Sequence, residues 1–298
     1  MKHRIVFALG FFDGVHLGHQ ALLRACRELA YANGAIPGAV TFDGHPEALL
    51  QQKAPKLINT LADREKLLRQ YGIETVLTFP FDRALMEMPW EDFFRMLLER
   101  GAAGFVCGED FRFGHRGIGN ARLLAEACQK ADIPCVIVPQ QELDGIRISS
   151  SHIRQLLEAG ETETAVRFLG HPHIFTGTVV PGRQLGRTMG IPTANLRLSD
   201  ELLVPKFGVY ACKVRLPDAL GGRKYPAVTN VGTRPTVEGH HITVESWLLD
   251  FDGDLYGHEL TLEFHAFLRP EKKFSSLEEL QAEIQKNAAE VAKIFEKD

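Results

Sequence analysis

The first half of the chain alternates short apolar runs with longer amphipathic stretches. The apolar runs are typical of buried strands, and they fall at 5–9, 36–42, 75–79, 104–108 and 135–139. Between them, apolar residues recur at helical spacing, which predicts helices over 17–33, 61–71, 90–100 and 121–131. Strands that alternate with helices of this length indicate an α/β fold with a doubly wound parallel sheet, the Rossmann-like class.

The pattern changes around residues 169–173, where helical spacing stops and glycine and proline cluster. Six short strands then follow, at 174–180, 194–198, 208–214, 225–231, 242–250 and 259–268. Six strands joined by glycine-rich turns predict a small closed antiparallel β-barrel. We therefore expect two domains, at residues 1–172 and 173–298.

A capping box, Ser276-Leu277-Glu278-Glu279, predicts the start of a C-terminal helix. The apolar positions of this helix share one face, which we expect to pack on the barrel; they are Leu277, Leu280, Ile284, Ala288 and Val291.

Composition narrows the class of protein. The 298 residues are 45% hydrophobic and 24% charged, which suits two ordinary globular domains. A net charge of −4 argues against a nucleic-acid partner, so a bound nucleotide would be a small molecule in a pocket. The sequence shows no signal peptide and no run long enough to span a membrane, and its five cysteines are scattered. We expect a cytoplasmic protein with no membrane partner, either a monomer or a weakly self-associating one.

The glycine-rich turn after the first strand carries the clearest chemistry. It reads Gly10-Phe11-Phe12-Asp13-Gly14-Val15-His16-Leu17-Gly18-His19. His16 and His19 are three residues apart at a helix start, so they project from one face, and Gly18 leaves room for a phosphate. The N–H groups at a helix N-terminus attract anions. Two surface histidines near a cap are the alternative, but the strand-to-helix context favours a phosphate site.

Two further stretches follow predicted strands. Residues 108–117 mix glycine, aromatic and arginine residues, although a polar surface loop could look the same. Residues 147–154 place three serines between Arg147 and Arg154. Hydroxyl donors between two cations suit a triphosphate, whereas N-capping explains at least one of the serines.

The barrel half contains two candidate segments. In the loop 186–195, Thr193 and Asn195 alternate to one side and offer oxygen ligands for Mg²⁺; from spacing alone, a hairpin turn with polar caps explains them equally well. In the strand 244–249, alternation puts Glu245, Trp247 and Leu249 on one face. A carboxylate on such a face is either a half-buried functional group or simply solvent-exposed.

These motifs resemble those of the prokaryotic bifunctional riboflavin kinase/FAD synthetase family. The turn 10–19 is similar to the nucleotidyltransferase signature, residues 147–154 to its second motif, and Pro192-Thr193-Ala194-Asn195 to the riboflavin kinase signature. Segments 230–236 and 250–257 also match the kinase half, so the resemblance covers nearly the whole chain. It implies that the barrel phosphorylates riboflavin with ATP to give FMN and ADP. The first domain would then adenylylate FMN with ATP to give FAD and pyrophosphate, with Mg²⁺ bridging phosphate oxygens.

The resemblance also implies residue roles. Glu245 would be the general base for the ribityl 5′-hydroxyl, while His16, His19 and Arg147 would act in adenylyl transfer. Other nucleotide contacts are implied for Gly10, Phe12, Asp13, Gly18, Asp110, Ser150, Ser151 and Arg154 in the first domain and for Gly186, Arg187, Gly190, Pro192 and Thr193 in the barrel. Flavin contacts are implied for Phe111, Asn230, Arg234 and Trp247, and metal contacts for Thr193 and Asn195. The family often has asparagine in place of Asp110, threonine in place of Ser151 and histidine in place of Trp247.

Two other functions stay open at this point. The chain could be a different adenylyl- or cytidylyltransferase with a non-catalytic barrel, which supplying FMN rather than riboflavin would distinguish. It could also be a flavin-binding regulatory protein that has lost turnover, in which case flavin would bind without product.

Overall fold

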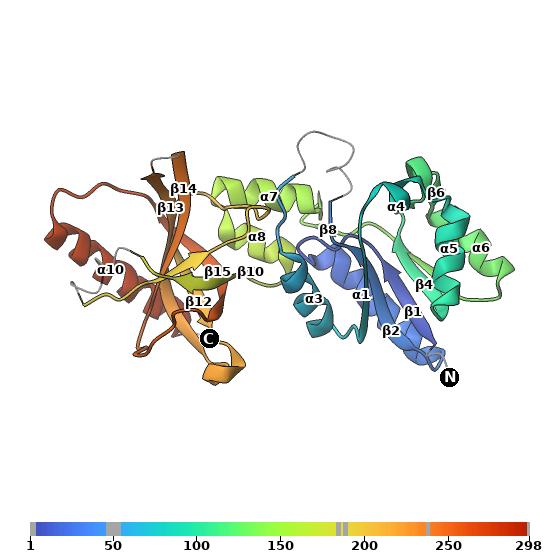
Figure 1. The fold of residues 1–298 in the computed structure, drawn as a ribbon, viewed down its shortest axis with the longest axis horizontal. Helices are drawn as coiled ribbons and strands as arrows, with labels where there is room; N and C mark the ends of the chain where they lie inside the picture. Colours follow the sequence, from blue (N-terminus) through green and yellow to red (C-terminus); the bar gives the residue numbers. More distant parts are fainter. Residues whose placement is uncertain (1–3, 46–54, 183–185, 187–189, 237–238, 297–298) are drawn as a thin grey trace. The chain divides into compact units, whose positions relative to one another are not determined.

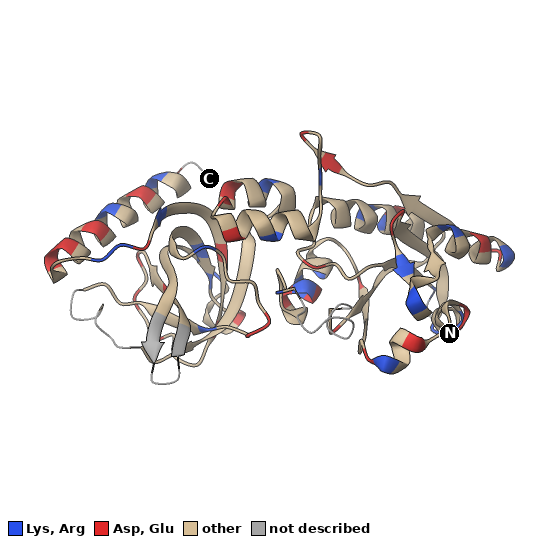
Figure 2. Cartoon of the chain, turned by 90° about the horizontal axis from the view of Figure 1, so that it is seen from above, with Lys and Arg blue, Asp and Glu red and all other residues tan. Residues whose placement is uncertain are grey.

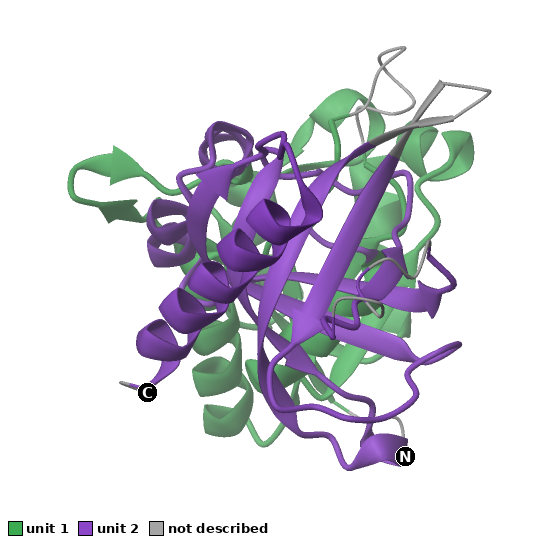
Figure 3. Cartoon of the chain, turned by 90° about the vertical axis from the view of Figure 1, so that its left-hand side faces the viewer, with its two compact units in different colours: residues 1–57, 61–150 green, residues 58–60, 151–298 purple. Residues whose placement is uncertain are grey.

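The computed structural model describes residues 4–45, 55–182, 186, 190–236 and 239–296. For residues 234–236 and 239–241 it describes only the backbone. The chain divides into two compact units, residues 1–57 with 61–150 and residues 58–60 with 151–298 (Figure 3). Each unit has its own sheet and its own core.

The first unit is built on a five-stranded parallel sheet in the order β3-β2-β1-β4-β7. Its strands are β1 (Ile5–Leu9), β2 (Ile36–Phe42), β3 (Thr75–Phe79), β4 (Ala102–Gly108) and β7 (Cys135–Val138). The chain runs from β1 to one edge through β2 and β3, then returns to the other side of β1 for β4. The switch point therefore lies between β1 and β4, where open α/β sheets bind ligands at the carboxyl ends of the strands.

Helices cover both faces of this sheet (Figure 1). Cys26 of α1 (Leu17–Ala32) donates to the carbonyls of Val6 and Gly38 on one face, and α3 (Leu61–Gln70) lies on the same side. On the other face, α5 (Trp90–Glu99) and α6 (Ala121–Lys130) pack on a core that includes Phe7 and Phe105. The doubly wound parallel sheet predicted from the apolar pattern is confirmed.

The sequence pattern did not reveal the smallest elements of this unit. They are α4 (Arg83–Glu87), the hairpin of β5 (Arg112–Phe113) and β6 (Gly119–Asn120), the hairpin of β8 (Glu142–Leu143) and β9 (Ile146–Arg147), and a 3₁₀ turn at His115–Gly117. Two-residue strands are too short for any periodicity to be visible in the sequence.

The second unit is a closed six-stranded barrel in the order β10-β11-β14-β13-β12-β15, as predicted. Its strands are β10 (His173–Val180), β11 (Ala194–Arg197), β12 (Gly208–Arg215), β13 (Lys224–Thr236), β14 (Gly239–Leu248) and β15 (Glu259–Pro270). Two helices precede it, α7 (Ser150–Ala159) and α8 (Thr162–Leu169), and a 3₁₀ turn at Asp218–Leu220 joins β12 to β13. Residues such as Phe175, Tyr210 and Phe264 fill the barrel interior.

Helix α10 (Leu277–Phe295) lies across the outside of the barrel strands (Figure 3). Its Val291 is fully buried against Val209, Ala211 and Val228. The expectation that Leu277 also packs on the barrel is wrong, because 58% of this residue is exposed. The packed cluster takes only the C-terminal half of the helix, so the capped first turn extends past it. The predicted cap is present, since Ser276 Oγ accepts the Glu279 N–H.

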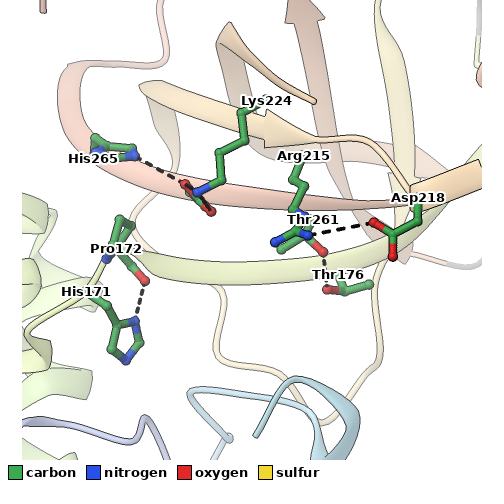
Figure 4. Close-up of polar contacts among 9 residues, drawn as sticks. His171, Pro172, Thr176, Arg215, Asp218, Lys224, Thr261 and His265 are labelled. Atoms are coloured by element: carbon green, nitrogen blue, oxygen red, sulfur yellow. Dashed lines mark hydrogen bonds and ion pairs between the residues drawn. The ribbon is translucent and has the colours of Figure 1, made fainter. Parts of the chain in front are cut away.

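Polar side chains brace the barrel from outside. Lys224 Nζ lies 2.7 Å from Glu263 Oε1, and the hydroxyls of Thr176 and Thr261 are 2.9 Å apart (Figure 4). Leu260 and Leu262 alternate with these β15 residues and fill the interior. Figure 2 shows acidic and basic residues interspersed along α10. Among the described helices, none is long and apolar enough to cross a membrane.

Candidate active sites

The turn after β1 has an unusual backbone. Phe12, Gly14 and Val15 have positive φ angles of 57°, 83° and 40°. Glycine adopts such a conformation freely, but a β-branched valine does so rarely and at a cost of about 1–3 kcal/mol. Phe12 and Val15 are fully buried, so packing holds the turn in this shape. Such strain, held in place by the surrounding core, is typical of functional sites.

His16 and His19 lie together at the start of α1. His16 is the N-cap residue, and its Nδ1 accepts the backbone N–H of His19 at 3.3 Å. The two rings stack with centroids 3.7 Å apart. With Nδ1 as the acceptor, the neutral tautomer of His16 carries its proton on Nε2, which makes that atom a donor. A Cβ at Gly18 would lie 3.2 Å from the His16 ring, so the glycine also makes room for this imidazole.

The charge state of His19 follows from its surroundings. Burial lowers its pKa well below the ordinary value, and the neighbouring His16 and Arg64 lower it further. At neutral pH, His19 is therefore an uncharged imidazole. Its Nδ1 is buried and has no hydrogen-bond partner among the residues that the structure describes. A neutral imidazole still has one N–H, so His19 can donate a hydrogen bond to a phosphate, but it holds no acidic proton to transfer.

The other two motifs of the first unit reach the same end of the sheet. Ser150 Oγ donates to the carbonyl of Asp13 at 2.8 Å, which ties the serine motif to the turn. Arg147 Nη2 donates to Asp110 Oδ2 at 2.8 Å, close to the end of β4. Both partners of this ion pair are more than half exposed, so the pair itself contributes little to stability. Three separate stretches of sequence thus meet at the switch point of the sheet.

The remaining predicted residues of this half lie nearby along the chain. Gly10 directly follows β1, and a Cβ there would lie 3.1 Å from the Phe12 ring. Phe111 stacks on Phe113 with centroids 5.4 Å apart and packs against the core. Ser151 is exposed and Arg154 is half-buried, both on α7 in the second unit.

In the barrel, strand register aligns three of the predicted residues. Asn195 of β11 is directly opposite Glu245 of β14, and Glu245 is directly opposite Asn230 of β13. Residues paired in this way point to the same face, on strands about 4.8 Å apart. The predicted metal ligand, base and flavin contact therefore form one row across three neighbouring strands. Asn195, Glu245 and Asn230 are all half-buried.

This row faces outward from the barrel. Val244 and Leu248 alternate with it and pack inside, whereas Trp247 packs with Val228 and Val291 under α10. Trp247 thus shares the face of Glu245, as the alternation predicts. Ser246, between them, is fully buried, and its hydroxyl lies 2.7 Å from that of Thr229.

A cavity of about 300 Å³ opens beside Thr193 and Asn195. The loop after β14 forms its other wall, with Phe251 and Tyr256 among its lining residues. The resemblance includes residues 250–257, but it implied no site role for any residue of this loop. The aromatic residues of this loop can be read from the sequence, but only the folded barrel brings them opposite residues 192–195.

Glycines bring the backbone close to the polar residues of this cavity. A Cβ at Gly182 would overlap the Asn195 amide, and one at Gly186 would overlap the carbonyl of Ile191. The Asn195 Nδ2 donates to the Thr193 carbonyl at 3.5 Å, so the amide is oriented by its own loop.

The remaining predicted residues of the barrel half lie at different places. Gly190 is exposed with a φ of 71°, and Pro192 lines the cavity. Arg187 lies outside the described residues, as does the side chain of Arg234, whose backbone belongs to β13.

Comparisons with known proteins divide the chain in the same way. Residues 1–152 match the FAD synthetase family, and residues 169–295 match the riboflavin kinase family. A bifunctional riboflavin kinase/FMN adenylyltransferase from Listeria monocytogenes is 33% identical over 98% of this chain and 93% of its own length. One from Pseudomonas fluorescens is 36% identical over 97% of this chain and 92% of its own length. A solved structure named a macrolide-efflux protein, from Streptococcus pneumoniae, is 31% identical with a TM-score of 0.86, over 97% of this chain and 94% of that one.

Proposed function

The chain belongs to the family of bifunctional riboflavin kinases/FMN adenylyltransferases, and we propose that each unit carries one of its two reactions at a site of its own. The protein phosphorylates riboflavin to FMN and adenylylates FMN to FAD, with ATP as the co-substrate of both reactions. Because both halves match, neither a non-catalytic barrel nor a transferase for another substrate is favoured.

Adenylyl transfer is assigned to the turn 10–19 and the residues that meet it. The FMN phosphate attacks the α-phosphorus of ATP, and pyrophosphate leaves. No protein nucleophile is needed, so the site acts by positioning and by stabilising charge. His16 Nε2–H, His19 and the N-terminus of α1 would contact the ATP phosphates, while Arg147 and Ser150 would hold the leaving group. The observation that supports this most strongly is the Ser150–Asp13 hydrogen bond, which joins two distant motifs at 2.8 Å.

Phosphorylation of riboflavin is assigned to the row on the barrel. Glu245 would accept the proton of the ribityl 5′-hydroxyl as that oxygen attacks the γ-phosphorus of ATP. Asn230, one strand away, would contact the flavin, together with Arg234 and Trp247. The cavity between Thr193 and the loop 251–256 would receive the nucleotide. Its size and its mixture of backbone, hydroxyl and aromatic groups suit a small-molecule site.

Mg²⁺ fits the barrel site by the chemistry of its donors. Thr193 and Asn195 offer neutral oxygens beside the Glu245 carboxylate, and Mg²⁺ prefers such ligands together with phosphate oxygens. When bound, the ion would neutralise charge on the phosphates. Within the described part of the chain, no cluster of three or more His, Cys, Asp or Glu could hold a metal. The protein would thus hold the ion through Thr193 and Asn195 only as a complex with the nucleotide.

Two further expectations belong to this proposal. The boundary between the activities is placed near residue 172, which is supported by the start of the riboflavin kinase match at residue 169. A cytoplasmic location is supported by the five cysteines, all of which are free thiols, because oxidising compartments favour disulfides.

The test is a product chromatogram of the purified protein with ATP and Mg²⁺. Riboflavin should give FMN and then FAD, and FMN supplied alone should give FAD with release of pyrophosphate. Chelation of Mg²⁺ should stop FMN formation. Failure to form FAD from supplied FMN would contradict the adenylyltransferase assignment, and failure to form FMN would contradict the kinase assignment.

A further inference from the structure

Arg64 is a charged residue that no motif of the sequence pointed to. It lies on α3, in the first unit, and is fully buried. A buried guanidinium is costly unless its surroundings compensate for the loss of water. Its location therefore requires an explanation, and the groups around it belong to the adenylyl-transfer site.

A chain of hydrogen bonds links Arg64 to the strained turn. Its Nη1 donates to Thr41 Oγ1 at 3.1 Å and to the carbonyl of Phe42 at 2.8 Å. Thr41 Oγ1 in turn donates to the carbonyl of Phe11 at 2.9 Å. The guanidinium also lies over the Phe11 ring, with Cζ 4.1 Å from its centroid. Arg64 thus holds Phe11 through both its backbone and its ring.

The guanidinium of Arg64 does not use all of its hydrogen-bond donors within the described part of the chain. Its Nε and Nη2 are buried and have no hydrogen-bond partner among the described residues. The two acceptors at the end of β2 take up only Nη1, so a purely structural role would leave most of the donor capacity unused. An unpaired buried donor costs about 1–3 kcal/mol.

The electrostatic surroundings show where the charge acts. The positive charge of Arg64 interacts with Asp13 and Glu65, and it lowers the pKa of the His19 imidazole. Asp13 and His19 belong to the turn 10–19. A buried charge acts over several ångströms, because water and salt do not screen it.

We propose that Arg64 is a positioning residue for adenylyl transfer, which fixes the turn 10–19 through Thr41 and Phe11 and supplies a buried positive charge beside the phosphates of the bound nucleotide. The inference rests on the assignment of adenylyl transfer to this turn. The phosphates of a nucleotide would supply acceptors for Nε and Nη2, which have none among the described residues. The kinase reaction, which takes place on the barrel, does not depend on Arg64.

The experiment measures kcat and KM for ATP in FAD formation from supplied FMN, with kinase activity recorded on the same samples. Arg64→Met keeps the length of the side chain and removes its charge. Thr41→Val removes the link to Phe11 and keeps the charge. Lys66→Met is the matched control, because Lys66 is exposed on the same helix with its nearest ion-pair partner, Asp63, at 3.7 Å.

Arg64→Met should raise the KM for ATP about tenfold or more, which corresponds to about 1.4 kcal/mol, and leave the kinase reaction unchanged. Thr41→Val should lower kcat a few-fold with a smaller change in KM, and Lys66→Met should behave as the wild type. Arg64→Lys should recover most of the affinity lost in Arg64→Met, because it restores the charge.

A pH profile of FAD formation separates a charge effect from a packing defect. Among the described residues, the charged and titratable groups around His19 are His16 on its own turn, Arg64 on α3, and Asp13, which interacts with Arg64. Loss of the Arg64 charge raises the pKa of His19, so the acid limb of the profile should move to higher pH. A defect of packing alone would leave the position of that limb unchanged.

An unchanged KM for ATP and an unmoved acid limb in Arg64→Met would overturn the inference. If Arg64→Met does not fold, the same kinetic constants are measured on Arg64→Lys instead. An equal loss of kinase and adenylyl-transfer activity in Arg64→Lys would overturn the inference as well. His16→Ala is run alongside. Its loss of FAD formation would establish the site, so that a normal Arg64 variant would contradict only the role of Arg64.

Discussion

The two sites are assembled in different ways. In the first unit, one continuous turn supplies both histidines, the strained backbone and the helix N-terminus, and distant residues only brace it. In the barrel, Asn195, Glu245 and Asn230 come from three strands and meet only because those strands pair in one register. The first site thus depends on local backbone conformation, and the second depends on the pairing of the sheet. A substitution should therefore impair one reaction and leave the other intact.

The largest effect is expected from Glu245→Gln. The amide keeps the size of the side chain but cannot accept the ribityl proton as a base. We expect FMN formation to fall by about 10²–10⁴-fold, with FAD formation from supplied FMN unchanged. Steady-state assays of the two reactions on one preparation measure this, and Glu259→Gln, an exposed residue of the same barrel, is the control. An equal fall in both reactions would show that the sites are not separate.

His16→Ala makes the converse change. It removes the Nε2 donor and also the Nδ1 acceptor that caps α1. FAD formation should fall by about 10²–10³-fold, while loss of the cap should cost about 1 kcal/mol. Kinase activity should persist, so that FMN accumulates from riboflavin. Persistence of FAD formation in a folded variant would contradict the role given to this turn.

A pH effect on stability should appear in the barrel unit. His173 is fully buried, and burial lowers its pKa from 6.5 to about 4. As the pH falls below 6.5, the unfolded chain takes up this proton before the folded chain does. Stability is therefore present above pH 6.5 and lost as the pH falls toward about 4, by about 3 kcal/mol in total for this one group.

Urea unfolding at pH 7 and pH 4.5 tests this expectation. The fluorescence of Trp247, in a Trp90→Phe background, reports the barrel unit. His173→Gln retains a donor for the Ile58 carbonyl, which His173 Nε2 contacts at 3.1 Å. The pH dependence should shrink in this variant, and an unchanged dependence would exclude His173 as its source.

The smallest effect is expected at Asp110. Asp110→Asn removes the charge that pairs with Arg147 and keeps an oxygen acceptor. The exposed pair contributes less than about 1 kcal/mol, so stability should hardly change. Arg147 is then more available to the nucleotide, and the KM for ATP in FAD formation should fall a few-fold. A rise in this KM would show that Asp110 itself has a positive role in binding.

The contrast between the two sites also explains what the sequence could predict. Strand–helix alternation predicted the parallel sheet, and six successive short strands with glycine-rich turns predicted the barrel, because these elements are long enough to show their period. The histidine turn was recognisable for a different reason, because its residues are contiguous in the sequence. The left-handed conformation of Val15 was not predictable, because only packing forces a valine into it.

Contacts between residues that are far apart in the sequence could not be predicted from the sequence alone. The spacing of Asn195, Glu245 and Asn230 does not reveal their alignment until the strand register is known. Arg64 reads as an ordinary polar position of a helix, and its burial depends on how α3 packs on β2. The loop 251–256 belongs to a segment that resembles the kinase half, but its place in the cavity wall depends on how the barrel folds.

The claim that two separate sites perform two reactions is tested most directly by mixing the two inactivated variants. Glu245→Gln and His16→Ala are each incubated with riboflavin, ATP and Mg²⁺, alone and together, and the products are separated by chromatography. Alone, Glu245→Gln should give almost no flavin nucleotide, and His16→Ala should accumulate FMN with almost no FAD. Together they should form FAD, because the FMN released by one variant is adenylylated by the other. Absence of FAD from the mixture, with both variants folded, would contradict the account.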